Sequence, residues 1–443
     1  MTLVPGYPMR LNIALRALLL FFVLLPMGAK AALEIRITQG VEGAMPIAVV
    51  PFGWQGSGTS APEDIASIVQ ANLHRSGQFA PLERGRMPQR PTTSGDVNFR
   101  AWRDAGVEHV VIGNLQATGQ DSYVVEFRLF DAVSGRQSTG HRIPISSSND
   151  LRRAAHMISD IIYQQITGVR GAFSTRVAYV SVTRENDQLR FALQVADADG
   201  HRPRTIFRST QPILSPVWSP DGRRLAYVSF ENRRSEVYVQ NVDGSGRELI
   251  ASHEGINSAP AWSPDGRLMA LTLSRDGQPD IYILNLSDRS LRKLTDSRSI
   301  DTEPEWMPDG RSILFTSDRS GSPQIYEVSA NGGQARRLSF EGRYNGNATV
   351  SPDGRLIAMV NGEGGRFRIA VLDRSNRLFR LLTDGRLDEA PSFAPNGSMI
   401  IYATAGARGQ GELAAVSADG RVRQSLVLQE GEVREPAWSP FLD

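Results

Sequence analysis

Short hydrophobic segments separated by turn-forming residues recur along the C-terminal part of the chain. In the segment 216–252, apolar runs at 225–228 and 237–239 are flanked by Pro220-Asp221-Gly222 and Asp243-Gly244. Proline sets φ at the first turn position, aspartate bonds to the following backbone, and glycine accepts positive φ. Apolar runs of this length between such turns are typical of strands. The pattern therefore predicts four short antiparallel strands in each repeat.

The repeat length is set by the segment Pro-x-Trp-Ser-Pro-Asp-Gly, first met at 216–222. Its aromatic position falls at Trp218, Trp262, Trp306, Val350, Phe393 and Trp438, with spacings of 44, 44, 44, 43 and 45 residues. A period of about 40–45 residues with four strands is typical of a β-propeller blade. We expect each aromatic side chain to pack between neighbouring blades.

The two ends of the repeat region complement each other. Residues 176–181 match a second strand that lacks a first strand before it, and 436–438 match a first strand that lacks a second one after it. Pairing of these two segments would give six blades and leave no open sheet edge. We therefore predict a six-bladed β-propeller over 171–443, closed by the C-terminal strand.

The chain before the propeller mixes the helix and strand periods. Strands are predicted at 46–52, 107–115 and 123–144, the last as a hairpin, and helices follow Pro62 and Asn149. This pattern predicts a small α/β domain over 46–170, so the fold class is an α+β N-terminal domain followed by an all-β propeller.

Residues 32–45 form a separate strand-forming segment. Leu33, Ile35 and Ile37 alternate with Glu34 and Arg36, which is the period of a strand. A strand at a chain end can pair with its own protein or with the open sheet edge of another one. The residues alone favour an edge strand of the α/β domain.

Residues 1–31 predict the compartment. Arg10 and Arg16 precede the apolar run 17–25, and Ala29-Lys30-Ala31 offers a small-x-small cleavage site, so we expect a secretory signal peptide rather than a membrane anchor. Without it the chain has 46 basic and 47 acidic residues, which gives no support to nucleic-acid binding. We expect an exported monomer without a membrane span. The absence of cysteine excludes disulfides and thiolate chemistry.

The loops that precede the first strand of each blade are the candidate binding surface. The first strand lies innermost in a propeller, so these loops open at the mouth of the channel. They vary in sequence while their surroundings repeat, which favours a role in binding over solvated loop polarity. Their polar and apolar mixture suits a peptide or protein, and the candidate residues are Ile256, Asn257, Thr302, Glu303, Asn345, Asn347, Asp388, Glu389, Arg434 and Glu435.

Catalysis has little support in the sequence. The chain lacks Gly-x-Ser-x-Gly and cysteine, and none of its six histidines lies in a repeated first strand. A propeller-gated hydrolase would need a nucleophile elbow, which the roughly 130 residues before the propeller do not contain. A small-ligand or metal-dependent propeller is the other alternative, although no cluster with metal-ligand spacing is present. We expect no cofactor and no metal.

The ordered set of motifs resembles the TolB family of the Tol–Pal system of Gram-negative bacteria. The resemblance covers essentially the whole chain after the signal peptide. Besides the six repeats, it rests on 46–52 (PIAVVPF), 61–65 (APEDI), 168–173 (GVRGAF), 225–228 (LAYV) and 302–304 (TEP).

The resemblance implies a periplasmic, non-enzymatic scaffold that maintains the outer membrane and supports envelope constriction at cell division. It implies that the propeller mouth binds the lipoprotein Pal, with Ile256, Asn257, Thr302 and Glu303 at the contact, although the family often has His where Ile256 stands. Colicins use the same mouth in some members of the family, so colicins and other outer-membrane proteins are further candidate partners. It also implies that an N-terminal switch segment binds TolA, through Ala32, Leu33, Glu34, Ile35, Arg36, Ile37, Gly40, Val41 and Glu42.

Overall fold

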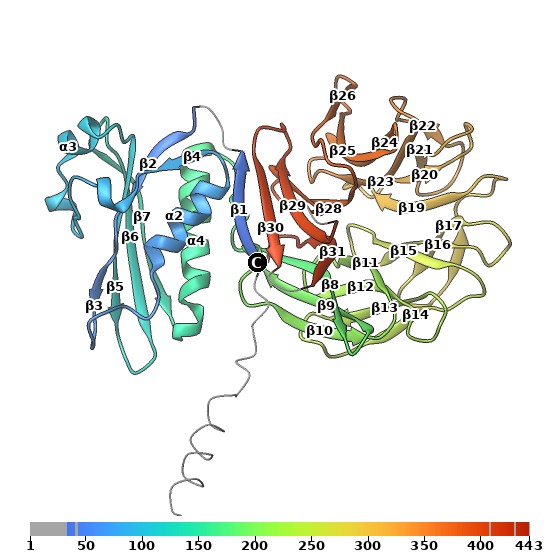
Figure 1. Cartoon of the computed structure of the whole chain (residues 1–443), viewed down its shortest axis with the longest axis horizontal. Coiled ribbons are helices and arrows are strands. Elements are labelled where there is room, and N and C mark those ends of the chain that lie inside the picture. The colour runs from blue at the N-terminus through green and yellow to red at the C-terminus, as the bar shows by residue number, and fades with distance from the viewer. Residues whose placement is uncertain (1–32, 40–42, 407–408, 429–430, 443) are drawn as a thin grey trace, which may run out of the picture. The chain divides into compact units, whose positions relative to one another are not determined.

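The computed structural model describes residues 33–39, 43–406, 409–428 and 431–442 (Figure 1). The predicted signal peptide lies outside these residues. Within the described ranges, no helix has the length and hydropathy that crossing a bilayer requires.

The α/β domain is built on a mixed sheet with the strand order β4-β2-β5-β6-β7, in which β3 also pairs with β5. The pairs β2–β4, β2–β5 and β3–β5 are parallel, whereas β5–β6 and β6–β7 are antiparallel. The strands are β2 (Met45–Val49), β3 (Gly53–Gln55), β4 (Phe79–Pro81), β5 (His109–Ala117), β6 (Tyr123–Asp131) and β7 (Arg136–Ile145).

Helices cover both faces of this sheet. Leu73 and Ile158 pack with Ile47 on one face, and Trp102 packs with Val110 on the other. The side chain of Asp64 caps the helix that begins at Ile65, because it accepts a hydrogen bond from the backbone N–H of Ser67. The helices are α2 (Ile65–Arg75), α3 (Phe99–Asp104), α4 (Leu151–Thr167), and the 3₁₀ turns η1 (Arg84–Arg86), η2 (Ser94–Asp96) and η3 (Ser148–Asp150).

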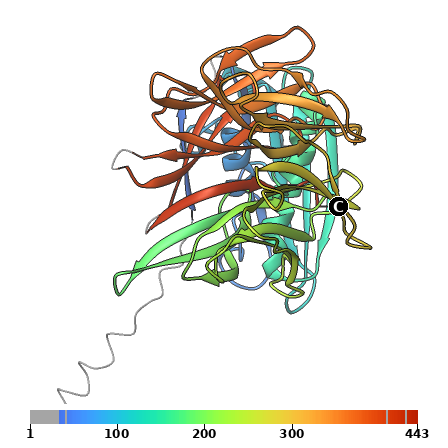
Figure 2. The same ribbon diagram turned by 90° about the vertical axis from the view of Figure 1, so that its right-hand side faces the viewer.

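Six antiparallel sheets form the propeller, and we number them as blades 1 to 6. Figure 2 shows the six sheets from a second side. Blade 1 is β8 (Arg176–Glu185), β9 (Gln188–Asp197), β10 (Arg204–Ser209) and β31 (Glu432–Trp438). Blade 2 is β11 (Ile213–Trp218), β12 (Arg224–Ser229), β13 (Glu236–Asn241) and β14 (Glu248–Ala251). Blade 3 is β15 (Asn257–Trp262), β16 (Leu268–Leu273), β17 (Asp280–Asn285) and β18 (Leu291–Lys293).

The remaining blades keep the same order. Blade 4 is β19 (Asp301–Trp306), β20 (Ser312–Ser317), β21 (Gln324–Ser329) and β22 (Arg336–Arg337). Blade 5 is β23 (Tyr344–Val350), β24 (Leu356–Glu363), β25 (Arg366–Asp373) and β26 (Leu378–Leu381). Blade 6 is β27 (Asp388–Phe393), β28 (Met399–Ala405), β29 (Gly411–Ser417) and β30 (Arg423–Leu428), and it gains a fifth strand, β1 (Leu33–Gln39).

The predicted closure of the ring is confirmed. The C-terminal strand β31 pairs antiparallel with β8, with Trp438 opposite Val177 and Ala437 opposite Ala178. In Figure 2 the red β31 and the green β8 lie side by side. The two chain-distant segments therefore complete one four-stranded blade, as their complementary patterns indicated.

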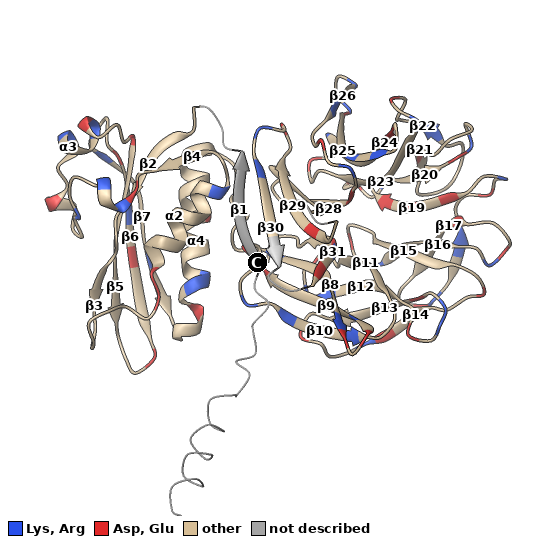
Figure 3. Ribbon diagram, in the orientation of Figure 1, with Lys and Arg blue, Asp and Glu red and all other residues tan. Residues whose placement is uncertain are grey.

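The repeated tryptophans pack between blades, as predicted. Trp218 of blade 2 packs with Ala178 and Ala437 of blade 1, and its indole N–H donates to the carbonyl of Ala437 at 2.9 Å. Trp262 of blade 3 packs in the same way with Val239 of blade 2. Charged side chains of both signs are interspersed over the described elements (Figure 3).

Candidate functional site

The inner strands of the propeller share one irregularity that shapes the channel. Each loses its register with the second strand at the same place. At that place the backbone of one non-glycine residue in each inner strand has φ between 47° and 56°. This is the left-handed conformation, which residues other than glycine disfavour. These six residues line a cavity of about 340 Å³ in the channel, and they are Ser215, Ala259, Glu303, Asn347, Ala390 and Glu435.

Two of these residues, both predicted site residues, tie neighbouring blades together. The carboxylate of Glu303 accepts hydrogen bonds from the backbone N–H of Asn347 and from Thr316, each at 2.7 Å. The carboxylate of Glu435 accepts from the backbone N–H of Ser215 at 3.1 Å. Burial raises the pKa of Glu435, and the nearby carboxylates of Glu389 and Glu303 add to this shift. Glu303 and Glu435 thus join blade 4 to blade 5 and blade 1 to blade 2.

A third channel carboxylate, Glu305, was not predicted from the sequence. Desolvation in the channel wall raises its pKa to about 7, and the hydrogen bonds from Thr349 and the backbone of Val350 offset this only in part. It stands at a repeat position that is Val217 in blade 2 and Ala261 in blade 3, and a comparison of the repeats reveals it.

Three of the predicted contact residues lie beneath the mouth rather than at its surface. Asn257 and Asn345 are completely buried and Asp388 is 1% exposed. The Asn257 amide donates to the carbonyl of His253 at 2.8 Å, and the Asn345 amide donates to that of Glu341 at 2.7 Å. Asp388 accepts from Thr383 and Thr404. In this state these side chains hold the mouth loops in place, and they are not available for the direct partner contact that we expected.

The neighbouring apolar residues are the ones that face solvent. Ile256, Ile300 and Leu387, each directly before a buried polar residue, are 44%, 50% and 40% exposed. Phe340, in the corresponding loop of blade 5, is 66% exposed. Only Ile256 was selected from the sequence. Exposed apolar residues on the mouth loops of four consecutive blades are characteristic of a surface that binds a protein partner.

The remaining predicted mouth residues are at least partly accessible. Thr302 and Asn347 are half-buried, and Glu389 and Arg434 are exposed. Arg434 pairs with Glu432 on its own strand. They provide polar groups around the apolar side chains, which is the arrangement of a typical interface rim.

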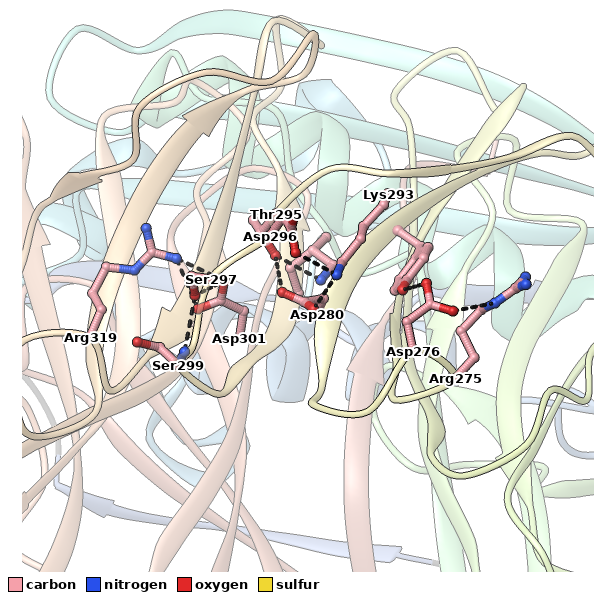
Figure 4. A network of polar contacts seen from close by, with 12 residues as sticks. Arg275, Asp276, Asp280, Lys293, Thr295, Asp296, Ser297, Ser299, Asp301 and Arg319 are labelled. Carbon is pink, nitrogen blue, oxygen red and sulfur yellow. Dashed lines mark hydrogen bonds and ion pairs between the residues drawn. The ribbon is translucent and has the colours of Figure 1, made fainter.

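A polar network holds the loop that carries Ile300 (Figure 4). Arg319 binds both carboxylate oxygens of the fully buried Asp301, at 2.8 and 2.9 Å. Lys293 contacts Asp280 at 2.9 Å and Asp296 at 2.7 Å, and these hydrogen bonds raise the pKa of its ammonium group. Sequence analysis missed this network, although Asp301 falls 44 residues after Asn257 and 44 before Asn345. That spacing is the signal that could have found it.

The N-terminal strand lies on the propeller and not on the α/β sheet that the residues alone favoured. β1 pairs antiparallel with β30, from Leu33 opposite Leu428 to Gln39 opposite Arg423 (Figure 1). Its partner strand is the outer edge of blade 6. Of the candidate residues in this segment, Ala32, Gly40, Val41 and Glu42 lie outside the described residues, and for 33–37 the structure describes the backbone.

One group of described side chains has the spacing of metal ligands, but its neighbours are cationic. One ligand atom each from His156, Asp197 and Asp199 lies within 4.8 Å of the others. The Asp199 carboxylate is already paired with Arg152 and lies 3.9 Å from Arg75. Two guanidinium groups at such a site repel a cation. The described lining of the channel contains carboxylates but no histidine, lysine or cysteine.

Fold and site together define a class: an α/β domain joined to a six-bladed propeller that exposes apolar side chains at its mouth and carries the N-terminal strand on one blade. A family model described as the TolB β-propeller domain matches residues 163–442, and one described as the TolB amino-terminal domain matches 33–138. The chain belongs to the TolB family.

Individual relatives support the same family assignment. The chain is 83% identical to the Tol-Pal system protein TolB of Thioalkalivibrio sulfidiphilus over 429 residues, which covers 97% of this chain and 98% of that protein. It is 61% identical to the protein of the same name from Nitrosococcus oceani, with the same coverage. The crystal structure of TolB from Acinetobacter baumannii superposes with a TM-score of 0.85 at 40% identity, covering 92% of this chain and all of that one. As a TolB, the chain is a periplasmic, non-enzymatic component of the Tol–Pal system.

Proposed function

We propose that the protein is a two-site scaffold: the propeller mouth binds the lipoprotein Pal, and residues 32–43 bind TolA when they leave blade 6. Through these two contacts it maintains outer-membrane integrity and supports envelope constriction at division. The observation that carries the proposal is the position of β1 at the outer edge of the same blade whose innermost strand, β27, begins at the mouth.

The mouth has the composition that a protein partner needs. Ile256, Ile300 and Leu387 provide apolar contact area, and Thr302, Glu389 and Arg434 provide polar groups around it. The buried polar residues beneath fix the loops, so little ordering entropy is lost on binding. Pal is the partner that family membership implies for this surface.

The N-terminal strand has the geometry of a displaceable element. A terminal strand held at a sheet edge leaves that edge unpaired when it departs, and it then has its own backbone groups free for another sheet. β1 cannot pair with β30 and with TolA along the same edge at once. The order β1-β30-β29-β28-β27 connects this edge to Asp388 and Glu389 at the mouth through one hydrogen-bonded sheet. A coupling of about 1–3 kcal/mol would change partner affinity several-fold or more.

A reversible lock tests the proposal. Ile35 and Leu426 are directly opposed in the β1–β30 ladder, so cysteines at both places lie at a separation that suits a disulfide. The natural chain has no cysteine, so the bond is unambiguous. Calorimetry with the soluble domains of Pal and TolA should show that the oxidised variant binds Pal and fails to bind TolA. The reduced form of the same variant, as its control, should bind both.

Two results would count against the scheme. TolA binding by the oxidised variant at the affinity of the reduced form would show that β1 does not need to leave blade 6. Deletion of residues 32–43 with unchanged Pal affinity and retained TolA binding would discard both the TolA site and the coupling.

A further inference from the structure

One repeat position of the outer strands contacts the next blade in most repeats, at the joint between the two blades. This position is occupied by Arg204, Glu248, Arg292, Arg336 and Arg380, each 44 residues after the one before. Arg204, Arg292 and Arg380 donate to a backbone carbonyl of the next blade, which is that of Val242, Ala330 and Ala418 respectively. Glu248 forms an ion pair with Arg289 of the next blade. At four of these five positions the side chain thus contacts the next blade.

Arg336, at the joint between blades 4 and 5, does not make this contact with the described residues of the next blade. Arg336 pairs with Glu327 of its own blade at 2.6 Å, and Arg374 of blade 5 contacts the same carboxylate at 3.2 Å. Arg377 stands 88 residues, or two repeats, after Arg289, and it has the same left-handed backbone, with φ of 58° against 61°. Arg289 pairs with Glu248. Two repeats later, the positions of this pair are occupied by Arg377 and Arg336, which are both cationic. Among the described residues Arg377 has no hydrogen-bond or ion-pair partner.

Two further differences between the repeats make the joint between blades 4 and 5 more positively charged than the joint between blades 2 and 3. Leu249 and Leu286 of the joint between blades 2 and 3 correspond to Arg337 and Arg374, two repeats later. Arg337 donates to Ser320 and to the carbonyl of Ser339 and has no carboxylate partner within the described part of the chain. Of the four guanidinium groups, those of Arg336 and Arg374 contact Glu327, and Glu341 is the one carboxylate of the described cavity lining. Like charges this close favour the binding of an anion.

The surface at this joint is hollowed. The four arginines line a cavity of about 420 Å³ together with Leu338 and Phe340. Phe340 is 66% exposed, and the guanidinium of Arg337 lies 4.8 Å from the centre of its ring. The hollow thus offers forked cationic donors next to one exposed aromatic face, a combination that the joint between blades 2 and 3 lacks.

We propose that this hollow binds an acidic segment of a partner protein, whose carboxylates pair with Arg336, Arg374 and Arg377 while an apolar side chain packs on Phe340. Apart from Phe340, which lies on a mouth loop, the residues of this site are not among the proposed Pal and TolA contacts, and the site stands whether or not those assignments hold. Guanidinium groups match carboxylates in a bidentate geometry, which gives the site its preference for planar oxyanions. A free phosphate ion would leave Phe340 uncovered. Phe340 is the one large apolar residue of the described lining that is exposed, so the hollow has little apolar area to insert into a lipid surface.

Fluorescence anisotropy with a fluorescein-labelled Glu-Glu-Phe-Glu-Glu peptide at about 50 mM salt, where surface charges are weakly screened, tests the proposal. The Arg336→Glu variant should bind the peptide about tenfold more weakly, because it restores the ion pair with Arg377 and closes the site. Its thermal stability should equal or exceed that of the natural protein. Arg292→Glu is the matched control, because it makes the same charge change at the same repeat position and should alter the affinity less than about twofold.

Phe340→Ser provides a second test that changes no charge and replaces an exposed side chain, so the fold is retained. It should weaken peptide binding about threefold without changing the salt dependence. Equal losses in Arg336→Glu and Arg292→Glu, or no binding by the natural protein, would overturn the proposal. Competition by inorganic phosphate at equal concentration would overturn it in favour of a small oxyanion. Co-sedimentation with phosphatidylglycerol vesicles, abolished by Arg336→Glu, would overturn it in favour of a membrane surface.

Discussion

The indole N–H of Trp438 donates to the hydroxyl of Thr175 at 2.8 Å, which joins the last strand of the chain to the residue directly before β8. The equivalent indole in blade 4, that of Trp306, is buried and has no hydrogen-bond partner in the described structure. The same residue type therefore has an additional bond at the place where the ring closes. Since blade 1 is the only described blade assembled from both ends of the repeat region, that bond acts on the element that holds the ring shut.

Replacing each of these two tryptophans by phenylalanine separates closure from packing. Both substitutions remove the same volume, but only Trp438→Phe loses a hydrogen bond, which contributes about 1 kcal/mol. We expect Trp438→Phe to lower the free energy of unfolding by about 1 kcal/mol more than Trp306→Phe, as measured by urea denaturation. Equal losses at the two positions would show that the indole bond adds nothing to closure.

The fold was largely predictable because the repeat carries its own alignment. Six copies of one motif fix the position of each first strand, and the incomplete copies at 176–181 and 436–438 predict the closure. The pairing of β1 was not predictable from its residues. Alternating apolar and polar positions indicate a strand but do not identify its partner, and residues 33–37 would satisfy any open edge.

At several places in the predicted mouth loops, the selected side chains are buried and their neighbours face solvent. Adjacent residues of a strand point to opposite sides, so an error of one position exchanges buried for exposed. Asn257 and Asp388 were selected for their polarity, yet they are buried and hydrogen-bonded within the loops, whereas Ile256 and Leu387 directly before them face solvent. The polarity of a residue is a poor guide to its exposure where the loop needs that residue for internal hydrogen bonds.

The buried histidine at the end of the α/β domain predicts an acid-sensitive fold. Burial, aided by Arg75 and Arg152 and opposed by Asp199, lowers the pKa of His156 to about 3. Its Nδ1 lies 2.9 Å from the Asn72 amide, and His201 also lies within electrostatic range. Because the unfolded chain takes up a proton near pH 6.5 and the folded chain does not, stability is full above that pH and falls as the pH is lowered toward 3.

In a Glu305→Gln background, which removes the opposing titration of that channel carboxyl, we therefore expect the free energy of unfolding to drop by about 1–2 kcal/mol between pH 6.5 and pH 5. Denaturation curves at these two pH values measure the drop. His156→Gln should flatten this dependence, whereas replacement of the exposed His141 by glutamine should leave it unchanged. A Glu305→Gln protein whose stability is constant over this range would contradict the assignment.

The channel carboxylate of Glu305 predicts the opposite dependence at higher pH. Its folded-state pKa of about 7 lies above the ordinary value of 4.5, so it contributes stability below pH 4.5 that is lost as the pH rises through 7. Glu305→Gln removes this loss, and we expect it to stabilise the protein by about 2–3 kcal/mol at pH 8 and to have little effect at pH 4.5. Thermal unfolding of the two proteins at both pH values tests this, and an equal shift at pH 4.5 would indicate a packing effect instead.

The exposed apolar residues of the mouth predict a loss of partner affinity without a loss of stability. Ile300→Ser changes a half-exposed side chain, so the free energy of unfolding should change by no more than about 0.5 kcal/mol. If Ile300 packs against Pal, its truncation should cost about 1–2 kcal/mol of binding, or about tenfold in Kd. Leu249→Ser is the matched control, because Leu249 is 47% exposed but lies on the outer strand β14, away from the mouth. Calorimetric titration of the three proteins with the soluble domain of Pal should separate Ile300 from Leu249, and equal affinities would place the Pal contact elsewhere on the propeller.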